Sequence, residues 1–357
     1  MELPLVVALR EDLSVDPAAD PALRADDLLF LFRKMLLLRA FDEKAVALQR
    51  AGRIGFFVPS FGQEAAEAGS AFALRDGDWI FPSYRDQGVA LVRGCPLETL
   101  VGQLFGNASD PTKGRQMPNH WCDRKVAIVS VSSPVATQLP HAVGAAYAAR
   151  LRGEKIAVIA CFGEGGSSTG EFHAAMNFAG VFGTPNVFFC TNNQYAISVP
   201  FSRQTAVASI AAKAGGYGFG GVRVDGNDLL AVCKVTRDAL EKARAGGGPT
   251  LVEALTYRMG PHSTSDDPTR YRTREEVEAW GKKDPLRRLA GHLSRLGLLD
   301  DAAAERMAGE ARDEVAGTVR ACEAAPPVPM ESLVEDVYAE MPWHLAEQRA
   351  WLSGREG

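Results

Sequence analysis

"KIAVIACFGEGGSSTGEFHAAMNFAGVFGTPNVFFCTNN", residues 155–193, joins two strand-like runs through a helix-like segment. Residues 155–163 are almost continuously apolar, as expected of a parallel strand buried on both faces. Residues 167–183 predict a helix with Ser168 or Thr169 as its N-cap, and residues 186–193 predict the next strand. This order of strand, helix and strand is typical of α/β folds.

The same alternation continues toward the C-terminus. "GVRVDG", residues 221–226, predicts a strand, residues from about 228 to 244 predict a helix, and "TLVEALTYR", residues 250–258, predicts another strand. The chain is therefore expected to form an α/β fold built on a doubly wound, mostly parallel sheet.

The N-terminal segment lacks this alternation. Residues 1–24 mix Pro, Asp and short apolar pieces, and they predict an arm laid over another part of the molecule. Residues 25–52 predict a helix that opens with Asp26 and Asp27 and ends at Gly52. Its apolar residues exceed a single stripe, so we expect it to be covered on more than one side.

The C-terminal segment is polar and helical. "HSTSDDPTRYR", residues 262–272, leads into a capping box from Thr273 to Glu276 and then into charged helices. We expect three parts: an N-terminal arm and helix over residues 1–50, an α/β domain over 51–262, and a loop with a helical C-terminal region over 263–357.

Composition excludes several classes of protein. The 357 residues carry a formal net charge of -5, and the basic residues are scattered, so we expect no nucleic-acid partner. No stretch approaches the ~20 apolar residues of a membrane span. The six cysteines form no CxxC pair and follow no secretory leader, which favours reduced thiols in a cytoplasmic protein.

Two polar side chains follow neighbouring strands of the predicted sheet. Glu164 ends the first strand and Asn193 ends the next, and ligands of open α/β sheets bind beyond these carboxyl ends. A carboxylate and an amide oxygen suit a magnesium ion that keeps phosphate oxygens as further ligands, and the following helix N-terminus favours an anion. Spacing alone leaves another interpretation open, in which Glu164 caps the helix and Asn193 makes a turn.

Residues 163–198, from Gly-Glu-Gly to the Asn-Asn pair and beyond, resemble the thiamine diphosphate motif. The chain is more closely similar to the alpha subunit of the decarboxylase component of branched-chain 2-oxo acid dehydrogenase complexes. The similarity spans roughly residues 50–345, and its blocks are "FPSYRDQG", "GNASDPTKGRQMP", "SSPVATQLPHAVGAAYAA", "RVDGND" and "YRMGPHSTSDDPTRYR". It implies the thiamine diphosphate-binding fold, with an active-site loop after residue 262.

The resemblance implies two sets of ligands for the cofactor. Magnesium would be held by Glu164, Asn193 and the main-chain carbonyl of Tyr195. The residues implied to bind the cofactor itself are Tyr84, Arg85, Ser133, Val135, Gly163, Glu164, Gly165, Gly166, Asn193, Tyr195 and His262. Without the resemblance, Arg85 beside Asp86 would be interpreted as a surface ion pair. His262 follows a predicted strand, and it is also a candidate proton donor or acceptor.

"SSPVATQ", residues 132–138, would otherwise be interpreted as a polar turn before a helix. By resemblance, Ser133 and Val135 meet the aminopyrimidine. In some relatives Ser132, Thr137 and Gln138 bind potassium. Ser263 matches a position that is phosphorylated in animal relatives, where a phosphate would crowd the cofactor.

Two positions bear on the comparison with relatives. Branched-chain relatives carry an Arg where this chain has Thr191, which puts one phosphate contact in doubt. Pyruvate-type relatives usually carry Asp where this chain has Glu164, which favours branched-chain substrates.

The implied function is oxidative decarboxylation of a small branched-chain 2-oxo acid, with transfer of the acyl group to a lipoyl-bearing acyltransferase component. Thiamine diphosphate supplies the carbanion chemistry. No glutamate of this chain is a convincing activator of the aminopyrimidine, so we expect a beta subunit to provide it in an α2β2 heterotetramer. The alternatives are a pyruvate or acetoin dehydrogenase alpha subunit and a non-catalytic Rossmann-type nucleotide-binding protein, although the chain lacks the GxGxxG pattern of the latter.

Overall fold

The computed structural model of the chain describes residues 3–354. Its main sheet contains six strands in the order β1-β7-β8-β4-β3-β2, and every neighbouring pair is parallel. The strands of this sheet are β1 (Leu5–Val6), β2 (Trp79–Phe81), β3 (Val158–Gly163), β4 (Asn186–Asn192), β7 (Gly220–Asp225) and β8 (Thr250–Leu255). The predicted parallel α/β sheet is confirmed.

A two-stranded antiparallel hairpin, β5 (Tyr195–Ala196) and β6 (Val199–Pro200), follows β4. The helices are α1 (Ala25–Arg50), α2 (Glu64–Phe72), α3 (Gln87–Arg93), α4 (Leu97–Phe105), α5 (Gln138–Leu151), α6 (Gly170–Phe182), α7 (Leu229–Arg244), α8 (Arg274–Gly281), α9 (Pro285–Arg295), α10 (Asp301–Glu323), α11 (Ser332–Glu335) and α12 (Trp343–Ser353).

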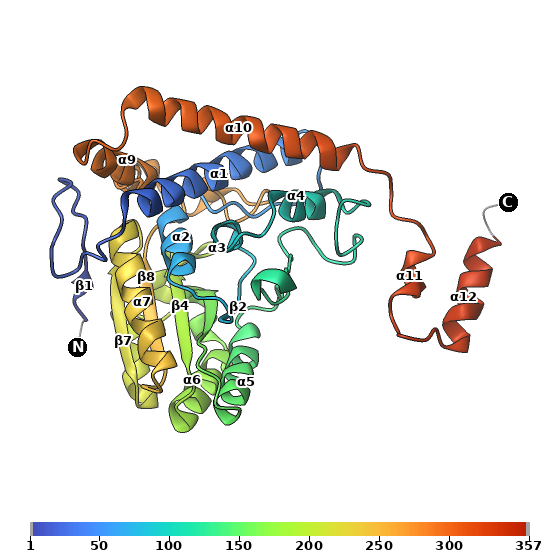
Figure 1. The fold of residues 1–357 in the computed structure, drawn as a ribbon, viewed down its shortest axis with the longest axis horizontal. Helices are drawn as coiled ribbons and strands as arrows, with labels where there is room; N and C mark the ends of the chain where they lie inside the picture. Colours follow the sequence, from blue (N-terminus) through green and yellow to red (C-terminus); the bar gives the residue numbers. More distant parts are fainter. Residues whose placement is uncertain (1–2, 355–357) are drawn as a thin grey trace.

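Helices cover both faces of the sheet, as a doubly wound fold requires. Along β3, Ile159 and Cys161 face one hydrophobic cluster, whereas Val158, Ala160 and Phe162 face another. The first cluster is shared with α1, α2, α7 and α10, and the second with α5 and α6. Figure 1 shows α5 and α6 side by side next to the strands, and the long helices α1 and α10 running along each other.

The strand ends determine where a ligand can bind. β3 and β4 are direct neighbours, and Gly163 pairs with Thr191 at their carboxyl ends. Thr169 caps α6 by accepting a hydrogen bond from the Phe172 N–H, as the sequence predicted. Glu164 therefore does not serve as the cap of α6, and that half of the alternative interpretation is wrong, whereas the Asn193 side chain does support a turn by accepting from the Tyr195 N–H.

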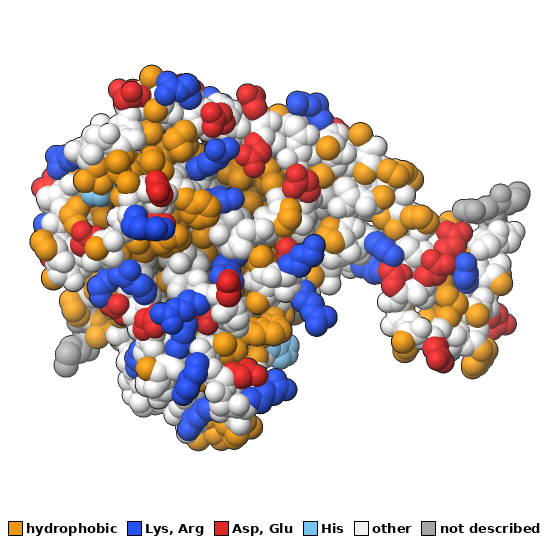
Figure 2. All heavy atoms as spheres, in the orientation of Figure 1, with side chains coloured by type: hydrophobic (Ala, Val, Ile, Leu, Met, Phe, Trp, Pro, Cys, Tyr) orange, Lys and Arg blue, Asp and Glu red, His pale blue; other side chains and the backbone are white. Residues whose placement is uncertain are grey.

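The C-terminal segment extends away from the main body. After α10 the chain leaves the sheet domain, and α11 and α12 form a separate lobe joined by a narrow neck (Figures 1 and 2). Within residues 3–354, no helix is both long and apolar enough to cross a membrane.

Candidate functional site

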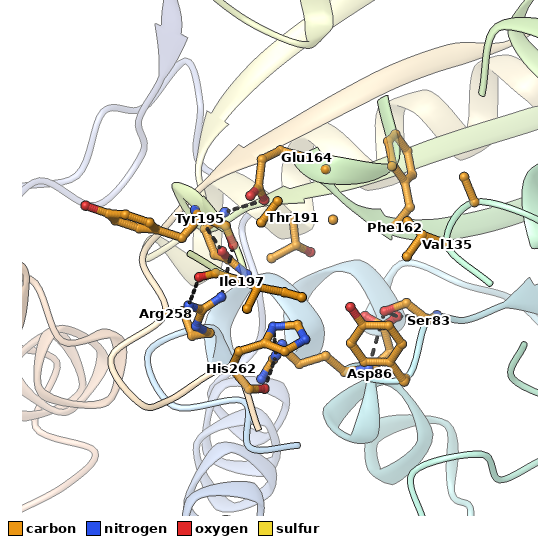
Figure 3. Close-up of a pocket in the computed structure, with 18 of the residues that line it drawn as sticks. Ser83, Asp86, Val135, Phe162, Glu164, Thr191, Tyr195, Ile197, Arg258 and His262 are labelled. Atoms are coloured by element: carbon orange, nitrogen blue, oxygen red, sulfur yellow. Dashed lines mark hydrogen bonds between the residues drawn. The ribbon is translucent and has the colours of Figure 1, made fainter. Parts of the chain in front are cut away.

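A cavity of about 350 Å³ opens at the carboxyl ends of β3 and β4 (Figure 3). A volume of this size is typical of small-molecule sites. Most residues that the sequence assigned to the site line it: Tyr84, Arg85, Ser132, Val135, Gln138, Gly163, Glu164, Gly165, Gly166, Asn193, Tyr195 and His262. The lining does not include Ser133 or Thr137.

Glu164 and Asn193 meet as the strand order predicts. The Asn193 N–H donates to Glu164 Oε2 at 3.2 Å, and the two residues are 1% and 7% exposed. Burial raises the pKa of the Glu164 carboxyl, and hydrogen bonds from Gln204 and Asn193 offset only part of this effect. Among the described residues, no lysine or arginine forms a salt bridge with Glu164, and the charge of Arg258 lowers its pKa only in part, so a cation bound here would favour the ionised carboxylate.

Asn193 and Tyr195, which line the same cavity as Glu164, also carry oxygen atoms that could bind a metal. Asn193 Nδ2 donates to Gln63 Oε1 at 3.1 Å, and Asn193 Oδ1 accepts from the Tyr195 N–H at 3.3 Å. These two hydrogen bonds fix the orientation of the Asn193 amide. The Tyr195 carbonyl lies on the same turn and accepts from Arg258. Carboxylate, amide and carbonyl oxygens are the ligands that Mg²⁺ prefers, and it usually keeps ligand or water oxygens as well.

A metal ion beside Glu164 would need a bound ligand to complete its shell. Residues 3–354 contain no group of three or more His, Cys, Asp or Glu side chains suited to a metal ion. Gly165 keeps the site open, since a Cβ there would lie 2.8 Å from the Cβ of Ala196. Any side chain at Gly165 would push the β5–β6 hairpin away from Glu164.

Arg85 supplies a buried positive charge. Its guanidinium donates to the carbonyls of Pro59 and His262, the latter at 2.6 Å. Burial lowers the pKa of Arg85 to about 10, so it stays protonated near neutral pH. The neighbouring Asp86 instead accepts from Ser83. The interpretation of Arg85 and Asp86 as a surface ion pair is therefore wrong, because both are buried and the structure records no salt bridge between them.

His262 is a neutral imidazole in this environment. Burial and then the charges of Arg85 and Arg258 lower its pKa to about 3. Arg85 Nη2 lies 3.3 Å from His262 Nδ1. Because a guanidinium can only donate, Nδ1 must accept and the proton must reside on Nε2. The Tyr84 ring packs edge-on against the imidazole, with the ring centroids 6.0 Å apart.

Sequence reasoning did not single out Arg258, which follows β8 and lines the same cavity. It is 1% exposed, and its guanidinium donates to the carbonyls of Tyr195 and Ile197 and to the Tyr271 hydroxyl. No described carboxylate forms a salt bridge with Arg258 or Arg85. Two buried guanidinium groups at one cavity favour an anionic ligand. The signal in the sequence was a charged residue at the end of the predicted strand over residues 250–258.

The residues of the 132–138 segment are partly brought together. The Thr137 hydroxyl donates to Ser132 Oγ at 2.8 Å, and Gln138 Nε2 donates to the Cys161 carbonyl at 2.7 Å. Gln138 Oε1 is buried and has no hydrogen-bond partner among the described residues. Ser133 instead bonds to the ring of His120 and is exposed.

Thr191 also lines the cavity. The guanidinium groups around this cavity come from Arg85 and Arg258.

Comparison with known proteins agrees with this geometry. The sequence model described as "Dehydrogenase E1 component" matches residues 32–331. The chain is 46% identical over 312 residues to the 2-oxoisovalerate dehydrogenase subunit alpha of Bacillus subtilis (strain 168), which covers 87% of this chain and 94% of that protein.

Two further relatives give a similar result. The 3-methyl-2-oxobutanoate dehydrogenase subunit alpha of Mycobacterium tuberculosis is 44% identical over 327 residues, covering 92% of this chain and 87% of that protein. The mitochondrial 2-oxoisovalerate dehydrogenase subunit alpha of Bos taurus is 43% identical over 345 residues, covering 96% and 76%.

Proposed function

Because the chain belongs to the dehydrogenase E1 component family, we propose that it is the alpha subunit of a branched-chain 2-oxo acid dehydrogenase. The enzyme oxidatively decarboxylates branched-chain 2-oxo acids, of the class that includes 3-methyl-2-oxobutanoate, and transfers the acyl group to a lipoyl group of an acyltransferase. The observation that carries this proposal is the buried Glu164, which forms no salt bridge, next to Asn193 at the ends of two adjacent strands.

The donor set fits thiamine diphosphate with magnesium. Glu164, Asn193 Oδ1 and the Tyr195 carbonyl would hold the metal, and Arg85 with Tyr84 and His262 would hold the diphosphate. Thiamine diphosphate, when bound, supplies the carbanion chemistry of decarboxylation. The glycines at 163, 165 and 166 leave room for the backbone to approach the ligand.

His262 is proposed as an acid or base of the reaction as well as a diphosphate ligand. Arg85 fixes its tautomer, so the proton available for transfer is on Nε2. A diphosphate bound beside it would raise the pKa of the imidazole, because an anion favours the charged form. Arg85 thus both attracts the anion and orients His262.

A potassium ion is proposed beside the cofactor site. The uncompensated Gln138 Oε1 and the adjacent hydroxyls of Ser132 and Thr137 are oxygen donors close together in sequence and space. A monovalent cation there would satisfy the buried amide oxygen. Ser133 and Val135 are proposed to meet the aminopyrimidine.

The activating glutamate is proposed to come from a beta subunit in an α2β2 heterotetramer that docks on a lipoyl-bearing acyltransferase. The exposed apolar side chains of the C-terminal lobe, such as Val337, Tyr338 and Trp343, support a role in assembly. In this division, residues 1–50 and 263–357 serve contacts and the active-site loop, and residues 51–262 hold the cofactor.

A substrate panel tests the proposal. The chain is copurified with its beta subunit, supplied with thiamine diphosphate and Mg²⁺, and assayed with an artificial electron acceptor. We expect 3-methyl-2-oxobutanoate to be used with a higher kcat/KM than pyruvate or acetoin. A wide preference for pyruvate would reassign the substrate. Thermal stabilisation by a dinucleotide, with none by thiamine diphosphate and Mg²⁺, would favour a nucleotide-binding protein instead.

A further inference from the structure

Gln63 is a buried amide next to one of the three oxygen atoms proposed to hold the metal. It lines the cavity and is 1% exposed. Its Oε1 accepts from Asn193 Nδ2 at 3.1 Å, although the two residues lie 130 positions apart in the chain. This contact joins the start of α2 to the end of β4.

The main chain holds Gln63 at this edge of the sheet. Its N–H donates to the Ser60 carbonyl at 2.9 Å, and its carbonyl accepts from the Glu67 N–H at 3.1 Å. The carbonyl of the preceding Gly62 accepts from Thr256 Oγ1, directly after β8, at 2.9 Å. The Gln63 side chain does not cap α2, so its replacement leaves these main-chain contacts in place.

The orientation of the Asn193 amide decides whether it can bind a metal ion. An amide side chain carries an oxygen on one branch and an NH2 group on the other, and only the oxygen is a metal ligand. With Nδ2 donating to Gln63, Oδ1 is the free branch, and it accepts from the Tyr195 N–H at 3.3 Å. That second contact is longer than the usual N–H···O range, so Gln63 provides the better of the two hydrogen bonds.

The other end of the Gln63 amide has no protein partner. Its Nε2 is buried and forms no hydrogen bond within residues 3–354. A buried donor without an acceptor is unfavourable, and a ligand oxygen in the cavity that Gln63 lines is a suitable acceptor. Such a ligand would also keep Gln63 in the orientation that Asn193 needs, because only Oε1 can accept from Nδ2.

We propose that Gln63 is a positioning residue for the metal ion, because it fixes the Asn193 amide so that Oδ1, and not Nδ2, is presented to Mg²⁺. This inference rests on the proposed function. It assigns part of the affinity for magnesium to a residue that does not touch the metal. Residues that orient a metal ligand commonly contribute about 10- to 100-fold to metal affinity.

The test measures Mg²⁺ binding rather than turnover. The complex of this chain with its beta subunit is freed of divalent cations, supplied with excess thiamine diphosphate and titrated calorimetrically with Mg²⁺. Gln63→Met keeps the length of the side chain and removes the acceptor, so we expect the Kd for Mg²⁺ to rise about tenfold.

Gln103→Met is the matched control. Gln103 is also a buried glutamine, and its Oε1 accepts from the His120 N–H, but it does not belong to the cavity lining. The Kd for Mg²⁺ should be unchanged in this variant.

A second background separates orientation from packing. Asn193→Asp carries an oxygen on both branches, so no orientation remains to be selected. In this background Gln63→Met should change the Kd for Mg²⁺ by less than about twofold. If Gln63→Met does not assemble with the beta subunit, Gln63→Ala replaces it in both backgrounds.

Two results would overturn the inference while the proposed function stands. One is an unchanged Kd in the Gln63 variant, and the other is an equal loss of affinity in the Asn193 and Asp backgrounds. A wild-type complex that binds no Mg²⁺ in the presence of thiamine diphosphate would overturn the proposed function as well.

Discussion

Glu164 is a buried carboxylate that accepts hydrogen bonds and forms no salt bridge, and the charge of Arg258 offsets only part of the effect of burial on its pKa. Glu164→Gln keeps the shape and removes the charge, so we expect the affinity for Mg²⁺ in the presence of thiamine diphosphate to fall about 100-fold, or about 3 kcal/mol. Without ligands the variant should unfold at a higher temperature than the wild type, because a buried carboxylate that forms no salt bridge is replaced by a neutral amide.

Calorimetric titration and a thermal melt measure the two effects. Glu171→Gln, an exposed change at the start of α6, is the control and should alter neither quantity. Unchanged Mg²⁺ affinity in Glu164→Gln would remove this carboxylate from the metal site.

His262 gives the ligand-free chain a defined pH dependence. Its folded pKa, about 3, lies below its ordinary value of 6.5. The unfolded chain therefore binds a proton that the folded chain does not, and stability falls as pH drops from 6.5 toward 3. His262 should contribute a slope of up to about 1.4 kcal/mol per pH unit to the free energy of unfolding. In His262→Gln this contribution to the slope should be absent. Urea unfolding between pH 4 and 7 measures it, and identical slopes in both proteins would show that His262 titrates normally.

Glu164 and Asn193 could be assigned to one site from sequence because each directly follows a strand-like run, and parallel strands align their ends. Arg258 was not assigned to the site from sequence. Its hydrogen-bond partners, the Tyr195 and Ile197 carbonyls, lie about 60 positions away in the chain. Hydrogen bonds to main-chain carbonyls leave no pattern in side-chain types, so sequence could not reveal these contacts.

The strands β3, β4, β7 and β8 and the helices α6 and α7 agree with the sequence-based expectation, since each is a run of six or more residues with a recognisable apolar pattern. The edge strands β1 and β2 were missed because two or three residues carry no period. The predicted capping box is half formed. Thr273 accepts from the Glu276 N–H, but the Glu276 side chain accepts from the Tyr195 hydroxyl instead.

Asp228 joins α7 to the N-terminal arm. Its Oδ1 caps the helix through the Ala231 N–H, and its Oδ2 accepts from the N–H groups of Ala8 and Leu9, both at 2.7 Å. Asp228→Ala loses the cap and leaves two buried donors unpaired, so we expect the free energy of unfolding to fall by about 3 kcal/mol.

Asp300→Ala is the matched control, because Asp300 is an exposed N-cap of α10. It should cost only about 1 kcal/mol. Equal losses in urea unfolding would mean that Asp228 does not anchor the arm.

The lobe of α11 and α12 exposes large apolar side chains, as is typical of a surface that a partner covers. α12 buries none of its side chains, and Trp343 is 78% exposed. Trp343→Ala should weaken association with the beta subunit at least about tenfold, since buried aromatic anchors commonly carry 2 kcal/mol or more of an interface. Analytical ultracentrifugation of the copurified subunits measures it, with Arg274→Ala, an exposed change on α8, as control. Full assembly of the Trp343 variant would assign the lobe another role.

The most direct test is a structure of the complete complex with thiamine diphosphate and Mg²⁺. We expect one metal ion about 2.1 Å from a Glu164 carboxylate oxygen, Asn193 Oδ1 and the Tyr195 carbonyl, with diphosphate oxygens filling its shell. A metal ion bound elsewhere, or a cofactor seated without these three oxygens, would contradict it.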